Sequence, residues 1–213
     1  MEITWYGHSC FRITERGMAT VVTDPYDHTE IGYSELNLRA DIITISHNAL
    51  GHNNTKVVKS SKWELDGPGE YEIGGVFLTA VPAGKTDKNG NGRNMVFILD
   101  YDGVTVGHLG DIDSVPSRKE VDAFGNVDVL LIPVGGGKGL SAAKAAEVIN
   151  LIEPGIVIPM HYSTPDCKMK LDSLGAFLKQ IGLSDQPETL ESLKVTKRDI
   201  PEETRVVVLT YKH

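Results

Sequence analysis

Histidine and aspartate side chains recur where apolar segments of this sequence end. His47 and His52 lie five residues apart in a polar, glycine-containing segment that follows a β-branched run. Asp111 and His161 each follow another apolar run. Imidazole nitrogens and carboxylate oxygens are the usual protein ligands of zinc, and they also suit iron and manganese. The residue types therefore point to a metal site.

Buried strands are expected to position these side chains. Residues 42–45 read as a buried strand, because four apolar or β-branched residues are followed at once by polar turn residues. All four candidate ligands lie at the carboxyl end of a predicted strand or in the turn just after it. They can therefore converge on one edge of the fold, where functional side chains are commonly presented.

The segment from His47 to His52 resembles the metal-binding turn of the metallo-β-lactamase superfamily, His-x-His-x-Asp-His. His47 and His52 match its first and last histidines, whereas its middle histidine falls on Ala49 and its aspartate on Gly51. Neither alanine nor glycine offers a metal ligand. Asp111, in the sequence Leu-Gly-Asp, resembles the bridging aspartate of the family.

The resemblance extends over most of the chain. Residues 7–11 (Gly-His-Ser-Cys-Phe), 23–25 (Thr-Asp-Pro) and 67–72 (Gly-Pro-Gly-Glu-Tyr-Glu) are similar to the small single-domain branch of Zn-dependent hydrolases that includes the UlaG-like lactonases. The resemblance implies an α/β (α+β) protein with the four-layer αββα metallo-β-lactamase fold, in which two packed mixed sheets carry helices on their outer faces. A single domain over residues 1–213 is expected.

The resemblance also implies which ligands are left. Members of this kind hold two metals with five histidines and two aspartates. Four of these seven positions remain, and residues 82–93, where another histidine ligand is expected, contain none. His52, Asp111 and His161 would form a three-ligand site with an open position, which suits one zinc ion at most, or manganese or iron. His47 belongs to the more depleted half of the site.

Two functions follow from a reduced site of this kind. The first is a metal-dependent hydrolase of an ester, a lactone or a phosphodiester, with Asp111 and His47 as catalytic residues and His47 or His108 as a proton carrier. The alternative is a catalytically silent pseudo-hydrolase, without metal, that serves as a binding or scaffold domain. The sequence leaves both open.

The composition limits the classes of partner that this protein is expected to bind. The formal net charge is -8, and no stretch gathers five or six basic residues, which argues against nucleic acid. No run of about 18 apolar residues occurs, which argues against a membrane span. The two cysteines, Cys10 and Cys167, have no metal-type spacing and favour a reduced, cytoplasmic setting. A small-molecule substrate or ligand is expected, and the oligomeric state cannot be read.

Local patterns predict most elements of the chain. We expect a three-stranded meander over residues 2–23, a helical turn at 34–38, hairpins about Gly74-Gly75 and Asp102-Gly103, a helix over 142–152, a helix over 170–180 and a last strand over 205–210. Three further polar residues have expected roles of their own. His8 reads equally well as a turn histidine bonded to backbone and as a functional one, His108 as a strand-end core residue, and Asp113 as an exposed loop residue.

Overall fold

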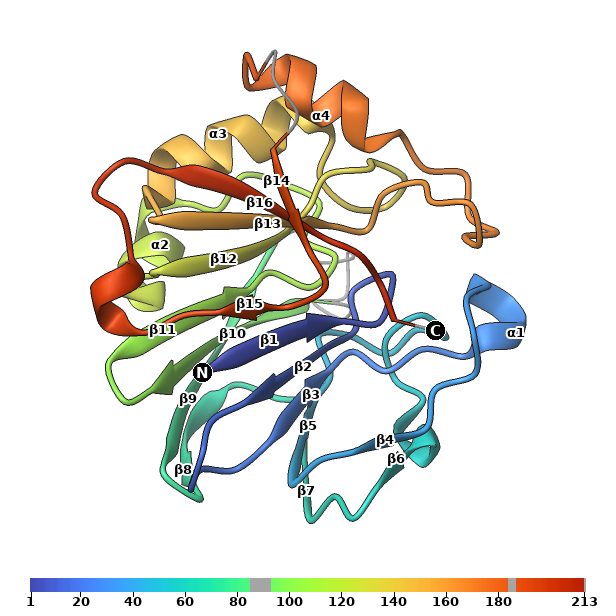
Figure 1. The fold of residues 1–213 in the computed structure, drawn as a ribbon, viewed down its shortest axis with the longest axis vertical. Helices are drawn as coiled ribbons and strands as arrows, with labels where there is room; N and C mark the ends of the chain where they lie inside the picture. The colour runs from blue at the N-terminus through green and yellow to red at the C-terminus, as the bar shows by residue number, and fades with distance from the viewer. Residues whose placement is uncertain (85–92, 184–186, 213) are drawn as a thin grey trace.

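Two large β-sheets pack face to face in the computed structural model, which describes residues 1–84, 93–183 and 187–212 (Figure 1). The first sheet has six strands, in the order β15 (Leu193–Lys194), β1 (Glu2–Trp5), β2 (Phe11–Thr14), β3 (Val21–Thr23), β5 (Ile42–Thr44) and β7 (Trp63–Leu65). The second has eight, in the order β14 (Glu188–Leu190), β16 (Arg205–Leu209), β13 (Ile156–Met160), β12 (Val129–Pro133), β11 (Val104–His108), β10 (Asn94–Tyr101), β9 (Val76–Ala83) and β8 (Gly69–Ile73).

The two predicted hairpins are confirmed in the eight-stranded sheet. Gly74 and Gly75 have φ of 56° and 81° between β8 and β9, and Asp102 and Gly103 have φ of 53° and 85° between β10 and β11. Two successive positive φ values give a turn whose twist matches that of the flanking strands, and glycine reaches them at the lowest cost. The sequence therefore encodes both turns locally.

Apolar side chains from both large sheets form the main core. It includes Trp5, Phe97 and Leu130, all almost completely buried. Every residue of β12 and β13 is buried, as expected for parallel strands that are covered on both faces. The two sheets therefore share one hydrophobic interior.

Helices cover the outer face of the eight-stranded sheet. Figure 1 shows α3 (Ala142–Ile152) and α4 (Leu174–Gln180) along the side away from the six-stranded sheet, with α2 (Arg118–Phe124) beside them. Helix α3 begins at Ala142, as predicted, and Ser141 caps it, because the Ser141 hydroxyl accepts a hydrogen bond from the Lys144 N–H. Among the described residues no helix is long and apolar enough to span a membrane.

A different layer covers the outer face of the six-stranded sheet. It consists of the single-turn helix α1 (His28–Ile31) and a short parallel ribbon of β4 (Leu38–Arg39) and β6 (Val58–Lys59). Val22 and Ile43 point outward into a second apolar cluster with this layer. Their neighbours in the chain, Val21 and Ile42, point into the main core, as the alternation of a strand requires.

Two predicted helices differ from the structure. The turn expected at 34–38 is wrong, because Leu36 and Leu38 are buried in the outer cluster and Leu38 begins β4. The helix expected at 170–180 begins only at Leu174. Asp172 N–H donates to the Gly135 carbonyl and its own carbonyl accepts from Ser163 N–H, so this backbone is committed to other partners. One-turn 3₁₀ helices lie at Thr55–Val57 (η1) and Lys197–Asp199 (η2).

Candidate metal centre

One edge of the sandwich collects the carboxyl ends of several strands. Strand β3 is parallel to β5, and β11 is parallel to β12, which is parallel to β13. Parallel strands end at the same edge of a sheet, and ligand sites commonly lie there. Asp24 follows β3, the segment from Ser46 to His52 follows β5, Asp111 follows β11, and His161 follows β13.

Asp24 is the buried anchor of this edge. Its carboxylate, fully buried, accepts hydrogen bonds from the Ser46 N–H at 2.6 Å and the Ser46 hydroxyl at 2.6 Å. It also accepts from His52 Nδ1 at 2.7 Å. Burial by itself raises the pKa of Asp24, but the neighbouring His52 and these hydrogen bonds bring it below its ordinary value. The carboxylate therefore stays ionised in the interior.

This hydrogen-bond network fixes the tautomers of two candidate ligands. Because ionised Asp24 only accepts, His52 Nδ1 carries a proton, and in the neutral imidazole Nε2 is then the nitrogen with the lone pair. The Ser46 hydroxyl donates to Asp24 and can therefore accept from His47 Nδ1, which lies 3.1 Å away. His47 Nε2 then also keeps its lone pair. A carboxylate behind an imidazole is the usual support of a metal-binding histidine.

A short turn places Asp111 opposite these histidines. Asn94 fixes the turn, since its side-chain oxygen accepts from the Asp111 N–H and its amide donates to the Leu109 carbonyl, both at 2.8 Å. Gly110 has a φ of 58°. An added Cβ there would overlap Asn94 and Ser46, so the turn requires glycine.

Asp111 and His161 meet at the floor of the site. Asp111 Oδ1 and His161 Nδ1 are 3.2 Å apart but are not aligned as a hydrogen bond. Both atoms, and His161 Nε2, are buried without a hydrogen-bond partner among the described residues. Buried polar atoms without a partner are uncommon and costly. They suit a site that is completed by a bound cation.

The pKa shifts of the site residues also agree with a bound cation. Burial lowers the pKa of His47 to about 4 and that of His161 to about 3, so both imidazoles are neutral at pH 7 and can offer lone pairs. Burial raises the pKa of Asp111, which means that its charged form lacks solvation. A divalent cation would supply the missing stabilisation of that carboxylate.

The structure brings the predicted ligands together, in a grouping that differs in part from the expected one. His47, His52 and Asp111 each offer a ligand atom within 4.8 Å of the other two. His161 contacts this group through Asp111, and its ring centroid is 6.4 Å from that of His52. The sequence interpretation placed His47 outside the three-ligand set, but geometrically it lies inside the convergent group. Imidazole nitrogens and a carboxylate in this arrangement fit a metal ion.

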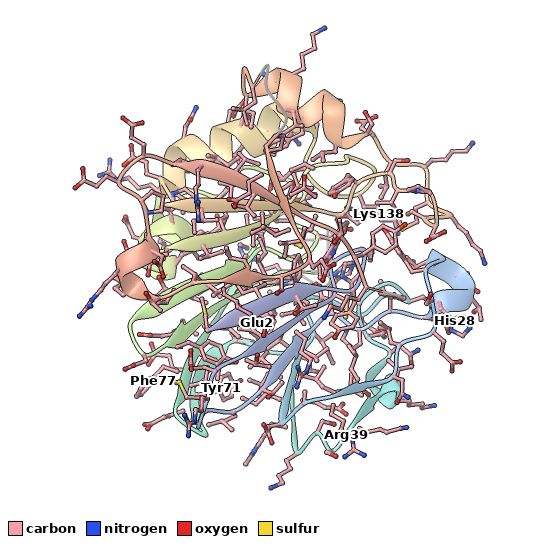
Figure 2. All side chains as sticks on the ribbon, viewed as in Figure 1. Glu2, His28, Arg39, Tyr71, Phe77 and Lys138 are labelled. Carbon is pink, nitrogen blue, oxygen red and sulfur yellow. The ribbon has the colours of Figure 1, made fainter. Side chains whose placement is uncertain are left out.

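A glycine-rich loop after β12 closes over the site. An added Cβ at Gly139 would overlap Asp111 Oδ1, and one at Gly135 would overlap the His161 carbonyl. Residues 135–139 therefore form a close backbone turn, in which the Gly139 N–H donates to the Gly136 carbonyl. Exposed Lys138 belongs to this loop (Figure 2), and its positive charge acts on Asp111.

Sequence reasoning missed two residues of the site. In the sequence Asp24 is visible only as a carboxylate directly after a predicted strand, in Thr-Asp-Pro, and the structure adds that it is fully buried. His8 was left open between two interpretations, and its ring lies against those of His52 and His161, with centroids 4.9 and 4.4 Å away. Tertiary contacts decide both roles.

His108 has the structural position that the sequence predicted. It is fully buried at the end of β11, and its Nε2 donates to the Ser9 carbonyl at 2.9 Å. Burial lowers its pKa. With one nitrogen committed to backbone and no exposed surface, His108 has no evident route for carrying protons to a substrate.

The buried neutral histidines predict how the metal-free protein responds to acid. In the unfolded chain a histidine has a pKa of about 6.5, whereas burial in the fold lowers the pKa of His47 to about 4 and that of His161 to about 3. Below about pH 6.5 the unfolded chain binds protons that the fold does not, so stability falls as the pH drops towards the folded values. Above about pH 6.5 the two histidines are neutral in both states, so they cause no change of stability with pH.

Thermal unfolding of chelator-treated protein tests this expectation. The melting temperature should change little between about pH 8 and pH 7 and fall between about pH 6.5 and pH 5. His161→Asn should show a shallower fall, because one depressed histidine is gone. A melting temperature that stays level down to pH 5 would contradict neutral histidines in the fold.

The two packed sheets and their histidine- and aspartate-bearing edge define a protein of the metallo-β-lactamase fold. A family model described as "Beta-lactamase superfamily domain" matches residues 2–161, and the chain therefore belongs to this superfamily. A proposed Zn-dependent hydrolase of the metallo-β-lactamase superfamily from Thermotoga maritima is 36% identical over 99% of each chain, with a TM-score of 0.80.

Relatives among curated sequences agree with this placement. A UPF0173 protein from Pyrococcus abyssi is 30% identical over 77% of this chain and 84% of its own length. A UPF0173 metal-dependent hydrolase from Archaeoglobus fulgidus is 28% identical over the same shares. The superfamily and the fold expected from the sequence are thus confirmed.

Proposed function

We propose that this protein is a metal-dependent hydrolase with a reduced, mononuclear site that acts on an ester, a lactone or a phosphodiester. The observation that carries the proposal is the convergence of His47, His52 and Asp111 within 4.8 Å, beside a buried histidine without a hydrogen-bond partner among the described residues. Relatives named as metal-dependent or Zn-dependent hydrolases support it.

The proposed ligands are His47, His52, Asp111 and His161. Imidazole nitrogens with one carboxylate suit zinc first, with manganese or iron as alternatives. A cation bound there supplies Lewis-acid chemistry, activating water and polarising a carbonyl or phosphoryl oxygen. Asp24 and Ser46 hold His47 and His52 with their Nε2 lone pairs free, so little reorganisation is needed on binding.

Two of these residues, Asp111 and His47, are also proposed to transfer protons. Asp111 has a pKa raised by burial, which moves the carboxylate towards the range of a general base. His47 is less buried than His52 and His161, and is therefore the most accessible histidine of the group. If His52, Asp111 and His161 alone hold the cation, His47 Nε2 stays free, and because His47 is neutral at pH 7 this nitrogen can take a proton from attacking water and return it to the leaving group.

The proposed substrate is a small molecule. Lys138, on the exposed loop over the site, places a positive charge where the charge of a phosphodiester or a developing oxyanion would be attracted (Figure 2). We further propose one domain over residues 1–213 and a cytoplasmic protein that acts without nucleic acid or membrane. The net charge of -8 favours the absence of nucleic acid.

A second candidate is the catalytically silent pseudo-hydrolase. It is favoured by Ala49 and Gly51, which leave two ligand positions of the family motif without a functional side chain. In this case the histidine cluster would be held by hydrogen bonds alone. Replacing His52, Asp111 and His161 by alanine would then leave the effect of added metal on the melting temperature at zero, as in the wild type.

Elemental analysis of protein purified after growth with added zinc, manganese and iron separates the two candidates. About one equivalent of metal is expected in the wild type, and well below one in His161→Ala, because that variant loses an imidazole from the floor of the site. His28→Ala is the matched control, since Figure 2 places His28 in α1 at the outside of the molecule. Wild-type protein with less than about a tenth of an equivalent would exclude the hydrolase and leave the silent domain.

A further inference from the structure

We infer that the glycine loop (residues 135–140, after β12) is an anion subsite that binds a phosphoryl group of the substrate beside the metal centre. The inference rests on the proposed function and narrows its substrate class to a phosphodiester. The subsite consists of the Lys138 side chain and the backbone N–H groups of Gly137, Lys138 and Leu140.

The glycine loop lies directly on two of the candidate ligands. An added Cβ at Gly139 would overlap Asp111 Oδ1 and would lie 3.3 Å from His161 Nδ1. The Gly135 N–H donates to the His161 carbonyl at 3.0 Å, which ties the start of the loop to the end of β13. A group that is bound by this loop would therefore be next to a cation that Asp111 and His161 hold.

Only some backbone N–H groups of the glycine loop are used within the fold. The Gly136 N–H donates to the Leu140 carbonyl at 2.9 Å, and the Gly139 N–H donates to the Gly136 carbonyl at 3.0 Å. The N–H groups of Gly137, Lys138 and Leu140 have no hydrogen-bond partner in the part of the chain that the structure describes. Gly137 and Lys138 are exposed, so that water can satisfy their N–H groups.

The N–H of Leu140 is the donor that points to a ligand, because Leu140 is 0% exposed. A buried backbone N–H without an acceptor is rare in folded proteins and costs about as much as a lost hydrogen bond. Preorganised N–H groups of this kind stabilise an oxyanion that forms during hydrolysis. The competing explanation is that Asp111, whose Oδ1 also lacks a partner among the described residues, turns to accept from Leu140.

Lys138 adds a positive charge to these donors. Its exposed side chain belongs to the loop over the site (Figure 2), and it takes part in no ion pair among the described residues. The carboxylate of Asp172, which lies against Gly136, is therefore not paired with it. The free ammonium offers three donors to the charged oxygens of a phosphodiester, whereas a neutral ester or lactone carries no charge to attract it.

Phosphate binding by the zinc-loaded protein tests the role of Lys138. Inorganic phosphate is titrated by calorimetry into the wild type, Lys138→Gln and Lys62→Gln at equal zinc content. Lys138→Gln should weaken phosphate binding about tenfold, because a charge-assisted hydrogen bond is lost. Lys62→Gln is the matched control and should bind phosphate as the wild type does. Lys62 lies before β7, which is parallel to β5, so it is at the opposite edge of that sheet from the segment that follows β5.

Amide NMR on the unaltered chain tests the backbone donors. In ¹⁵N-labelled, zinc-loaded protein, phosphate should move the amide proton signals of Gly137, Lys138 and Leu140 downfield, because each N–H gains a charged acceptor. The Leu140 signal should move in the same direction in Lys138→Gln once phosphate saturates the site. Loop amide signals that stay in place while phosphate binds would show that the metal alone holds the anion, and would overturn the inference.

Two chromogenic substrates with the same leaving group test the substrate class. Bis(4-nitrophenyl) phosphate carries a negative charge, and 4-nitrophenyl acetate is neutral. Lys138→Gln should lower kcat/KM about tenfold for the phosphodiester and less than about twofold for the acetate. An increase in salt from about 0.05 M to about 0.5 M should reduce the difference between the wild type and the variant, because an exposed charge is screened. An equal fall for both substrates would overturn the selection of a phosphodiester.

The failure of this inference differs from the failure of the proposed function. Unchanged phosphate affinity in Lys138→Gln, in a protein that binds zinc, would overturn the subsite and leave the proposed hydrolase standing. Absence of zinc binding by the wild type itself would overturn the proposed function, and this inference with it.

Discussion

Asp111→Asn is expected to abolish stable metal binding and to lower hydrolysis at least about 1000-fold. The change keeps the size of the side chain and removes the only carboxylate of the convergent group His47, His52 and Asp111 among the described residues. A neutral amide is a poor replacement for an anionic ligand of a divalent cation. Loss of the bound ion removes several kcal/mol of transition-state stabilisation, and about 4 kcal/mol corresponds to about 1000-fold.

The measurement combines metal content with a hydrolysis screen of aryl esters, lactones and bis(aryl) phosphodiesters. Asp113→Asn is the matched control, because Asp113 lies two residues along the chain and outside the convergent group found in the described residues. Its metal content and rate should stay close to wild type. Full metal content and activity in Asp111→Asn would show that Asp111 is neither ligand nor catalyst.

Asp24→Ala is expected to have the largest combined effect on stability and metal affinity. Removing the carboxylate leaves the Ser46 N–H, the Ser46 hydroxyl and His52 Nδ1 without their acceptor in a fully buried place. Breaking a buried charged network by deleting one partner costs about 3–5 kcal/mol. His52 and His47 also lose the contacts that fix their tautomers, which should weaken metal binding about 10- to 100-fold.

Urea unfolding and metal titration of two Asp24 variants test this expectation. Asp24→Asn keeps the shape, and asparagine tolerates the observed φ of 40°, but its amide nitrogen cannot accept from Ser46 or His52. We therefore expect Asp24→Asn to lose metal affinity with a smaller loss of stability. Asp27→Ala, which removes only the N-cap of α1, should leave metal affinity unchanged. Wild-type affinity in both Asp24 variants would contradict the supporting role of Asp24.

Local sequence signals were sufficient to predict much of the fold. The hairpins at Gly74-Gly75 and Asp102-Gly103, and the helix that starts after Ser141, depend on residues within a few positions of one another. Positive φ at turns and side-chain capping are short-range effects, so the sequence reports them directly. The apolar run at residues 42–45 likewise indicated a buried strand, which the structure has as β5.

Long-range pairing decided the elements that the sequence placed wrongly. Residues 170–173 carry an apolar pattern that continues into α4, yet Asp172 bonds to Gly135 and Ser163. A helical turn was expected at residues 34–38, but Leu36 and Leu38 are buried in the outer apolar cluster and Leu38 begins β4. Helical periodicity only measures which side chains can share a face. It does not register a competing partner elsewhere in the chain.

The sequence by itself determined the superfamily and four candidate ligands, because His47, His52, Asp111 and His161 lie in recognisable positions after strands. Only the tertiary structure decided how they are supported and completed. Asp24 follows β3 and His8 lies in the β1–β2 turn, 28 and 44 residues from His52 in the chain, yet both contact its ring. Such contacts arise because the fold brings distant strand ends and turns to one edge, and no local pattern in the sequence records them.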